Sequence, residues 1–318
     1  MKIAAADWLP YALQLKRPWQ TSRGELNQRV GRLLRLQSAD GLLGWGDSAP
    51  LPEFGISEAS ATAFAEECAH LDLITQQAGL PLNAWLSGEP PAGFVTVNRN
   101  LGPILKCSAE ALTDAANAGF YILKLKVGVA TLGDEIAALH RLAKSLPAGL
   151  SLRLDANGAW NLADAESFIA ACAGLPIEGL EEPLAQPTPD LLQKLQSTAA
   201  FPLAIDESTQ LLDVHFFRHP PVRRIVIKPA RHGGLLASVE LALRARASAI
   251  EVIVTSSLES ACGLLACAHF AAAVAPDAVH GLGTAEWFAE DTGSLPAIAG
   301  ARFALPSSPG IGFQPLKL

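Results

Sequence analysis

Acidic residues end three consecutive short apolar runs in the middle of the chain. Asp155, Glu181 and Asp206 stand 26 and 25 residues apart. One βα unit takes about that many residues, so each acid is expected at the carboxyl end of a strand, on one face of a barrel. Three carboxylates held close repel one another unless a cation neutralises them, and an all-oxygen set suits Mg²⁺, or else Mn²⁺. We therefore expect a metal site here; taken singly, each acid could instead cap a helix or lie in a surface loop.

Three lysines end neighbouring runs. Lys124 and Lys126 lie two residues apart on an apolar strand, so their side chains point the same way, and Lys228 follows Asp206 by 22 residues. A buried lysine pair is costly without partners, unless both reach solvent from an edge strand. We expect each lysine to lower the pKa of the other and a dication to lower both, which suits a base. Lys228 is expected across the barrel from Lys126, unless it only pairs with Asp206 or Asp155.

Other polar residues near these runs are candidate substrate contacts. Arg153 precedes Asp155 by two residues, where it either contacts an anionic substrate group or pairs with a neighbouring acid. The hydroxyls and amides of Thr255, Ser256 and Ser257 follow the seventh expected strand and could bind a carboxylate at a helix N-terminus; ordinary helix capping is the alternative. The chain has neither a GxxxxGK[ST] loop nor a GxGxxG fingerprint, and it offers no Ser/His/Asp arrangement.

Composition sets the broad class of the protein. Of 318 residues, 50% are hydrophobic and 17% are charged, so a large buried core is expected and disorder is not. The net charge is −7 with no basic block, which argues against a nucleic-acid partner. A small-molecule carboxylate substrate would then need local positive charge, which the lysines and a metal could supply.

Cysteine use and hydropathy favour a cytoplasmic protein. The five cysteines include no CxxC pair, and we expect them to be reduced and buried. The first residues lack the sustained apolar stretch of a signal peptide. Residues 261–275 are the most apolar run, but they are too short to span a bilayer and include His269, so we expect a buried helix and no membrane partner. The oligomeric state is left open.

Residues 1–90 predict an α+β capping domain. The alternation of polar and apolar residues, followed by a turn signal, predicts an antiparallel hairpin. Its strands and turn are residues 29–36, 42–46 and 39–41. Residues 57–86 have the pattern of a helix, with Ser57 as its N-cap. The stretch 87–93 is a boundary by composition. Residues from about 290 to 318 are rich in Pro and Gly, and we expect them to return to this domain and complete it.

Strand and helix signals alternate over residues 91–290 and predict an α/β domain, a TIM-like (β/α) barrel. Continuous apolar strands suit parallel strands that are buried on both faces. Asn161 and Thr188, the latter followed by Pro189, are expected to cap two of the helices. The eight candidate strands are residues 94–98, 121–127, 150–155, 177–181, 202–206, 223–228, 251–255 and 279–282.

Five ordered motifs resemble the enolase superfamily, in its muconate-lactonizing branch. They are Lys124-Leu125-Lys126, Asp155-Ala156-Asn157, Glu181-Glu182-Pro183, Asp206-Glu207-Ser208 and Lys228. The resemblance extends over the whole barrel, and the hairpin with residues 45–52 is similar to the capping domain of that family. Within the branch, residues 152–160, 226–229 and 256–260 are most similar to the o-succinylbenzoate synthase family.

The resemblance implies a magnesium-dependent syn dehydration in menaquinone or phylloquinone biosynthesis. In that reaction 2-succinyl-6-hydroxy-2,4-cyclohexadiene-1-carboxylate loses water through an enediolate and becomes o-succinylbenzoate. The implied roles are Lys126 as base and then acid, Lys124 as a contact to the carboxylate, and Lys228 as a cation over the other face of the ring. Asn157 joins Arg153 and the run 255–257 as a candidate substrate contact.

Other functions stay open. Racemisation or epimerisation of N-acyl amino acids or dipeptides would use the same metal, with Lys126 and Lys228 acting on two faces. Residues 281–286 lack the acidic pair with which dipeptide epimerases hold a substrate ammonium. A Schiff-base lyase with Lys228 as nucleophile would be independent of metal, and a non-enzymatic binding barrel would have little reason to keep buried charges. Residues 17–24 are a candidate lid over the mouth.

Overall fold

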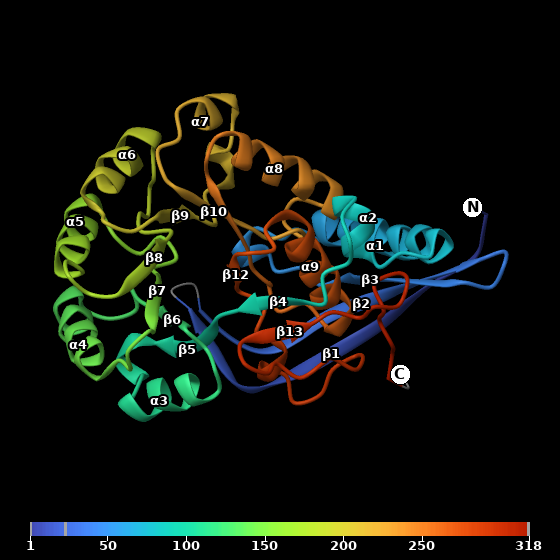
Figure 1. The fold of residues 1–318 in the computed structure, drawn as a ribbon, viewed down its shortest axis with the longest axis horizontal. Coiled ribbons are helices and arrows are strands. Elements are labelled where there is room, and N and C mark those ends of the chain that lie inside the picture. Colours follow the sequence, from blue (N-terminus) through green and yellow to red (C-terminus); the bar gives the residue numbers. More distant parts are fainter. Residues whose placement is uncertain (1, 22–23, 317–318) are drawn as a thin grey trace.

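Parallel strands form a ring at the centre of the molecule. The structure, a computed structural model, describes residues 2–21 and 24–316. One sheet runs in sequence order from β5 to β11, and Figure 1 shows helices α3 to α8 around the outside of the ring. The strands of this sheet are β5 (Arg99–Pro103), β6 (Ile122–Lys126), β7 (Ser151–Asp155), β8 (Ile177–Glu181), β9 (Leu203–Ile205), β10 (Arg224–Ile227) and β11 (Glu251–Val254).

Two further strands close the ring. β4 (Phe94–Val97) is separated from β5 only by residue 98, and it pairs in parallel with β12 (Val279–His280). A parallel bridge between Thr255 and Gly281 joins β12 to the end of β11. The predicted barrel is therefore confirmed. The difference is that the first predicted strand continues, after a break, as β5, which the apolar pattern does not predict because its residues are half-exposed.

Helices fill the gaps between the strands, as predicted. Asn161 and Thr188 cap α5 and α6, since their side chains accept hydrogen bonds from the amides of Asp164 and Leu191. The helices are α3 (Ala109–Asn117), α4 (Leu132–Ser145), α5 (Leu162–Ala171), α6 (Pro189–Thr198), α7 (Val214–Arg218), α8 (Leu235–Ala247) and α9 (Ala261–Val274), with single 3₁₀ turns η2 (Ile104–Lys106), η3 (Thr209–Leu211) and η4 (Ala285–Trp287).

The apolar run after residue 260 forms α9, which is buried along almost all of its length, as predicted. His269 within it is a structural residue. Its Nδ1 accepts the amide of Asn83 at 3.2 Å, and its Nε2 lies 3.1 Å from the carbonyl of Ile311. Burial lowers the pKa of His269 to about 4, so the ring stays neutral. None of the helices in residues 2–21 and 24–316 has both the length and the apolar character to cross a bilayer.

The N-terminal part forms a three-stranded antiparallel sheet that extends to one side of the barrel (Figure 1). Its elements are β1 (Ile3–Thr21), β2 (Gly24–Ser38), β3 (Leu43–Ser48), η1 (Pro52–Phe54), α1 (Glu58–Ala78) and α2 (Leu82–Ser87). The hairpin of β2 and β3 and the Ser57 cap are confirmed. The single helix predicted over 57–86 is wrong: Gly79, at φ 69°, ends α1, and α2 begins after Pro81.

The C-terminal segment returns to this part of the molecule. The amide of Leu82 donates to the carbonyl of Gly310 at 2.9 Å. Asp72 on α1 is buried and accepts the amides of Trp45 on β3, at 3.0 Å, and of Ile311, at 2.8 Å. The same segment also carries β13 (Arg302–Ala304), which pairs with β4. The domain boundaries near residues 90 and 290 stay a prediction.

Replacing Asp72 tests how firmly the C-terminal segment is attached. Asp72→Ala leaves two buried amides without an acceptor, at about 1–3 kcal/mol each, so the free energy of unfolding should fall by about 2–4 kcal/mol. Urea titration measures the change. Asp40→Ala, in the exposed turn between β2 and β3, is the control and should stay within about 0.5 kcal/mol of wild type. Equal stability of both variants would contradict the attachment.

Candidate active site

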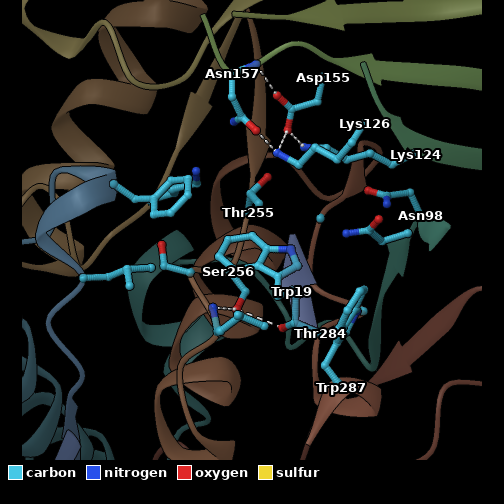
Figure 2. A pocket seen from close by; sticks show the side chains of 18 residues that line it. Trp19, Asn98, Lys124, Lys126, Asp155, Asn157, Thr255, Ser256, Thr284 and Trp287 are labelled. Carbon is cyan, nitrogen blue, oxygen red and sulfur yellow. Dashed lines mark hydrogen bonds and ion pairs between the residues drawn. The ribbon is translucent and has the colours of Figure 1, made fainter. Parts of the chain in front are cut away.

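Six charged side chains predicted from the sequence meet at one end of the barrel. Lys126, Asp155 and Glu181 stand beside one another in the parallel ladder at the carboxyl ends of β6, β7 and β8. Asp206 and Lys228 directly follow β9 and β10. The six side chains are all buried and comprise Lys124, Lys126, Asp155, Glu181, Asp206 and Lys228. Figure 2 shows the β6 lysines pointing toward Asp155.

Ion pairs neutralise the three acids. The Lys124 ammonium lies 2.9 Å from Asp155 Oδ2 and also contacts Glu181, so it bridges two carboxylates. Lys126 pairs with the same Asp155 oxygen at 2.9 Å. Lys228 lies 2.5 Å from Asp206 Oδ2. Burying a charge is tolerable only with such partners, so the predicted proximity of acids and lysines follows from their mutual compensation.

The acids also fit a divalent cation by their chemistry. Asp155, Glu181 and Asp206 offer only oxygens, as Mg²⁺ prefers, and Glu181 Oε1 is buried with no hydrogen-bond partner among the described residues. With the side chains as they stand, no three His, Cys, Asp or Glu side chains in residues 2–21 and 24–316 form a group that could hold a metal. The ammonium groups of Lys124 and Lys228 lie against these acids instead. The metal site stays a prediction.

The ion pairs of the site favour the charged forms of Asp155 and Lys124. Burial would raise the pKa of Asp155, but the charges of Lys124 and Lys126 outweigh it and hold that pKa well below its ordinary value. Burial would lower the pKa of Lys124, but Asp155 and Glu181 raise it well above its ordinary value. With the lysines and acids alone, the expected lowering of the Lys124 pKa does not occur, because the neighbouring carboxylates outweigh burial.

A pocket lies over these groups. Lys124, Lys126 and Asp155 lie on one side of it, and Ser256, Trp19 and Trp287 lie on the other (Figure 2). The rings of Trp19 on β1 and Phe54 pack together with centroids 5.2 Å apart. The lining includes Trp19, Leu51, Phe54, Asn98, Asn100, Lys124, Lys126, Asp155, Asn157, Lys228, Thr255, Ser256, Ser257, Leu258, Thr284 and Trp287.

The loop between β11 and α9 brings its hydroxyls, but not its amides, to the pocket. Thr255 Oγ1 and Ser257 Oγ are buried without a hydrogen-bond partner among the described residues. Ser256 Oγ donates to Glu259 Oε2 at 2.6 Å, and the amide of Ser257 donates to the same oxygen at 2.7 Å. The amide of Ser260, the N-cap of α9, is also taken. The expectation that these amides bind a carboxylate is wrong for Ser257, because Glu259 already accepts its amide.

Arg153 follows the second of its two predicted alternatives. Its guanidinium is buried and makes a two-pronged ion pair with Glu178, at 2.8 and 3.0 Å, and donates to the carbonyl of Val279 at 2.9 Å. Arg224 pairs with Glu178 at 2.7 Å and with Glu251 at 2.8 Å. These residues line a second pocket, separate from the one that the lysines line. Arg153 does not line the pocket of the lysines, so the substrate contact proposed for it is not supported.

Sequence reasoning missed several residues around the site. Arg231, three residues after Lys228, pairs with Asp206 Oδ1 at 2.8 Å and donates to the carbonyl of Phe54 at 3.0 Å. Asn157 was predicted as a substrate contact and does line the pocket, but its side chain also accepts from Lys126 and donates to Glu207 at 2.8 Å. No spacing rule marks Arg231, since its partners come from distant segments.

The candidate lid over residues 17–24 is only partly described. Residues 17–21 end β1, and Gly24, which pairs with Thr21, begins β2. The guanidinium of Arg17 lies 4.3 Å from the centre of the Trp287 ring, which places the hairpin end against η4. Residues 22–23 lie outside the described residues. A role as a lid stays a prediction.

Arg153 offers a test that separates packing from catalysis. Arg153→Met breaks a buried ion pair and should lower the free energy of unfolding by about 3–5 kcal/mol, measured by urea titration. Because Arg153 lies outside the pocket, KM per folded molecule should not change. Arg153→Lys, which keeps the charge but not the two-pronged contact, covers the case in which the Met variant does not fold. A stable variant with a raised KM would instead indicate that Arg153 contacts the substrate.

Comparison with known proteins places the chain in a family. A family model described as "Enolase C-terminal domain-like" matches residues 107–317. An o-succinylbenzoate synthase from Pectobacterium atrosepticum is 30% identical over 276 residues, which cover 81% of this chain and 83% of the relative.

Solved structures share the fold. A muconate lactonizing enzyme from Pseudomonas fluorescens, in complex with muconolactone, has a TM-score of 0.86 at 21% identity and covers 99% of this chain and 96% of its own. A dipeptide epimerase from Cytophaga hutchinsonii, in complex with Mg and the dipeptide D-Ala-L-Val, has a TM-score of 0.87 at 21% identity and covers 100% and 97%. These likenesses agree with the barrel and its N-terminal sheet. The chain belongs to the enolase superfamily, as its five motifs predicted.

Proposed function

We propose that the protein is a magnesium-dependent o-succinylbenzoate synthase of menaquinone or phylloquinone biosynthesis. It would convert 2-succinyl-6-hydroxy-2,4-cyclohexadiene-1-carboxylate into o-succinylbenzoate by syn loss of water. The observation that carries the proposal is the placement of two buried lysines, Lys126 and Lys228, on one pocket from strands that have three strands between them. The relative from Pectobacterium, which bears this name, supports the choice of reaction.

Proton transfer would fall to Lys126. In its neutral form it removes the proton from the ring carbon that bears the carboxylate, and the electron pair passes into that carboxylate as an enediolate. The resulting ammonium gives the proton to the hydroxyl on the neighbouring carbon, which leaves as water from the same face. The new double bond completes an aromatic ring, which favours the forward direction.

The neighbouring charges would stabilise the dianionic intermediate. Mg²⁺, which Asp155, Glu181 and Asp206 would hold, would supply positive charge for the developing enediolate. The Lys124 ammonium lies beside Asp155 and would contact the substrate carboxylate. Lys228 would face the ring from the other side as a cation against its electron density. Burial of all these groups strengthens each electrostatic interaction, because little water screens it.

The polar loop after β11 would receive the other end of the substrate. The substrate is a dianion, and its succinyl carboxylate needs hydrogen-bond donors at a distance from the acids. Thr255 Oγ1 and Ser257 Oγ have no hydrogen-bond partner among the described residues, and both residues line the pocket from the loop after β11, apart from the lysines of β6. Trp19 and Phe54 would shield the ring from water.

Racemisation or epimerisation of N-acyl amino acids or dipeptides is the second candidate. The two lysines could exchange protons on opposite faces of one carbon, and the fold is shared with a dipeptide epimerase. Against a dipeptide substrate, the residues of 281–286 that line the pocket are Gly281, Gly283 and Thr284, while Glu286 pairs with Arg99. No described acid there would hold an ammonium group. Deuterium exchange at the α-carbon of N-succinyl amino acids, measured by NMR, distinguishes the two reactions.

Replacing the proposed base tests the assignment. Lys126→Ala should lower kcat by about 10³-fold or more, because positioned proton transfer contributes about 10²–10⁴-fold and no other group can replace it on that face. Product is quantified by liquid chromatography, and circular dichroism checks the fold. Lys144→Ala, on the exposed surface of α4, is the matched control and should match wild type. Turnover of Lys126→Ala at the wild-type rate would refute the base.

Removing divalent ions tests the cofactor. EDTA treatment should abolish turnover and added Mg²⁺ should restore it, since only a cation beyond the lysines can offset the extra negative charge of an enediolate. Isothermal titration of the metal-free protein should show one Mg²⁺ bound, and Asp206→Asn should weaken this binding, whereas Asp277→Asn, on the exposed surface, should not. Full activity in EDTA would favour the metal-independent Schiff-base alternative.

A further inference from the structure

The loop between β11 and α9 is held in shape from outside the barrel. It spans residues 255–260 and carries the hydroxyls of Thr255 and Ser257, which have no hydrogen-bond partner in the part of the chain that the structure describes. On its far side lie three buried residues of the N-terminal sheet: Tyr11 on β1, Arg29 on β2 and Asp47 on β3. We propose that Arg29, Asp47 and Tyr11 are positioning residues that set the geometry of this loop and so determine how a second substrate carboxylate is bound.

Arg29 joins two loops that line the pocket. Its Nε donates to the carbonyl of Leu258 at 3.2 Å, and its two terminal nitrogens donate to the carbonyls of Pro50, at 2.6 Å, and Ala49, at 2.5 Å. In the described chain it has no carboxylate within ion-pair distance. A buried guanidinium without an ion pair depends on such carbonyls for its solvation, so all three contacts must be kept. Arg29 thereby fixes the loop after β11 against the loop that follows β3.

Asp47 holds the other end of the loop. Its Oδ2 accepts the amide of Ser260 at 2.7 Å, at the N-terminus of α9, and its Oδ1 accepts the Tyr11 hydroxyl at 2.7 Å. Two glycines leave the space this requires. A Cβ at Gly263 would lie 2.8 Å from Asp47 Oδ2, and one at Gly31 would lie 2.4 Å from the Tyr11 oxygen. The packing of both elements is therefore built around the contact.

The backbone of the loop is strained, which is why it needs this support. Leu258 has φ 60°, a conformation that a residue with a branched side chain seldom adopts. Its amide donates to Ser256 Oγ at 3.0 Å, and its carbonyl is the one that Arg29 binds. Strain of this kind persists only where the surroundings over-determine it. Without Arg29, the loop would relax, and the two free hydroxyls would move with it.

The inference rests on the proposed function for the identity of the ligand but not for the mechanical link. Thr255 and Ser257 line one wall of the pocket, and Lys124 and Lys126 of β6 line another. A ligand with two carboxylates would use both walls, and a ligand with one would use only the lysine wall. We call the contacts of Arg29, Asp47 and Tyr11 with this loop the clamp. Loss of the clamp should therefore weaken the binding of a ligand with two carboxylates and leave the binding of a ligand with one carboxylate unchanged. A purely structural role would lower the folded fraction without changing the ratio of the Kd values for the two kinds of ligand.

Two conservative variants with matched controls test the clamp. Arg29→Lys keeps the charge but loses the fork, and Tyr11→Phe removes only the hydroxyl that Asp47 accepts. Titration calorimetry with o-succinylbenzoate should show Kd raised about tenfold in each, the effect expected for one hydrogen bond involving a charged group, with benzoate binding unchanged. Steady-state assays should show the change in KM more than in kcat. Arg35→Lys, on the same strand and paired with Asp7, and Tyr121→Phe should match wild type.

Hydrogen exchange provides a readout that needs no turnover. Mass spectrometry of peptides covering residues 255–263 should show faster exchange in Arg29→Lys and Tyr11→Phe, because the amides of Ser257 and Ser260 depend on the loop shape. Unchanged exchange together with an unchanged ratio of the two Kd values would overturn the clamp. A wild-type protein that neither binds nor forms o-succinylbenzoate would overturn the proposed function and the assigned ligand, while the exchange result would still decide the mechanical link.

Discussion

Charge compensation inside a barrel is the constraint on which the rest of the structure depends. Ionised groups that leave water must find partners, and here the partners come from adjacent parallel strands. Asp155 serves both lysines of β6, and Asp206 serves Lys228 and Arg231. The register of the parallel strands brings these charged groups together, so the pairing of the charges depends on the order of the strands. Within this cluster, Glu181 Oε1 has no hydrogen-bond partner among the described residues, and we propose that it takes part in binding a further cation.

The two ends of the barrel use charge in opposite ways. Below the lysines, Arg153 and Arg224 both pair with Glu178, at 2.8 and 2.7 Å. At the mouth, the lysines face a pocket and remain accessible to a substrate. The same pair of residue types, a cation and an acid on neighbouring strands, is therefore structural at one end and proposed as catalytic at the other. The position of the pair along its strands, at the carboxyl ends or below them, decides which of the two roles it has.

Much of the fold could be predicted from spacing, and the exceptions have physical causes. Strands recur with the period of a βα unit, so the parallel order and the six charged groups follow from sequence. β1 escapes prediction because its alanines and prolines are poor strand formers. Arg153 lies two residues before Asp155 on the same strand, so its side chain points to the same side. Its ion pair with Glu178 nevertheless makes it a structural residue. The amide of Ser260 donates to Asp47, which lies more than two hundred residues away in the sequence, and no local pattern predicts this contact.

The central claim is that the three buried carboxylates form one cation site, which the lysines only partly neutralise. Crystals of the protein grown with Mn²⁺, measured for anomalous scattering, test it most directly. The account predicts a single strong peak bounded by Asp155, Glu181 and Asp206, with the Lys124 ammonium moved away from the Asp155–Glu181 bridge. Anomalous density only at other places, with all three acids still paired to lysines, would contradict it.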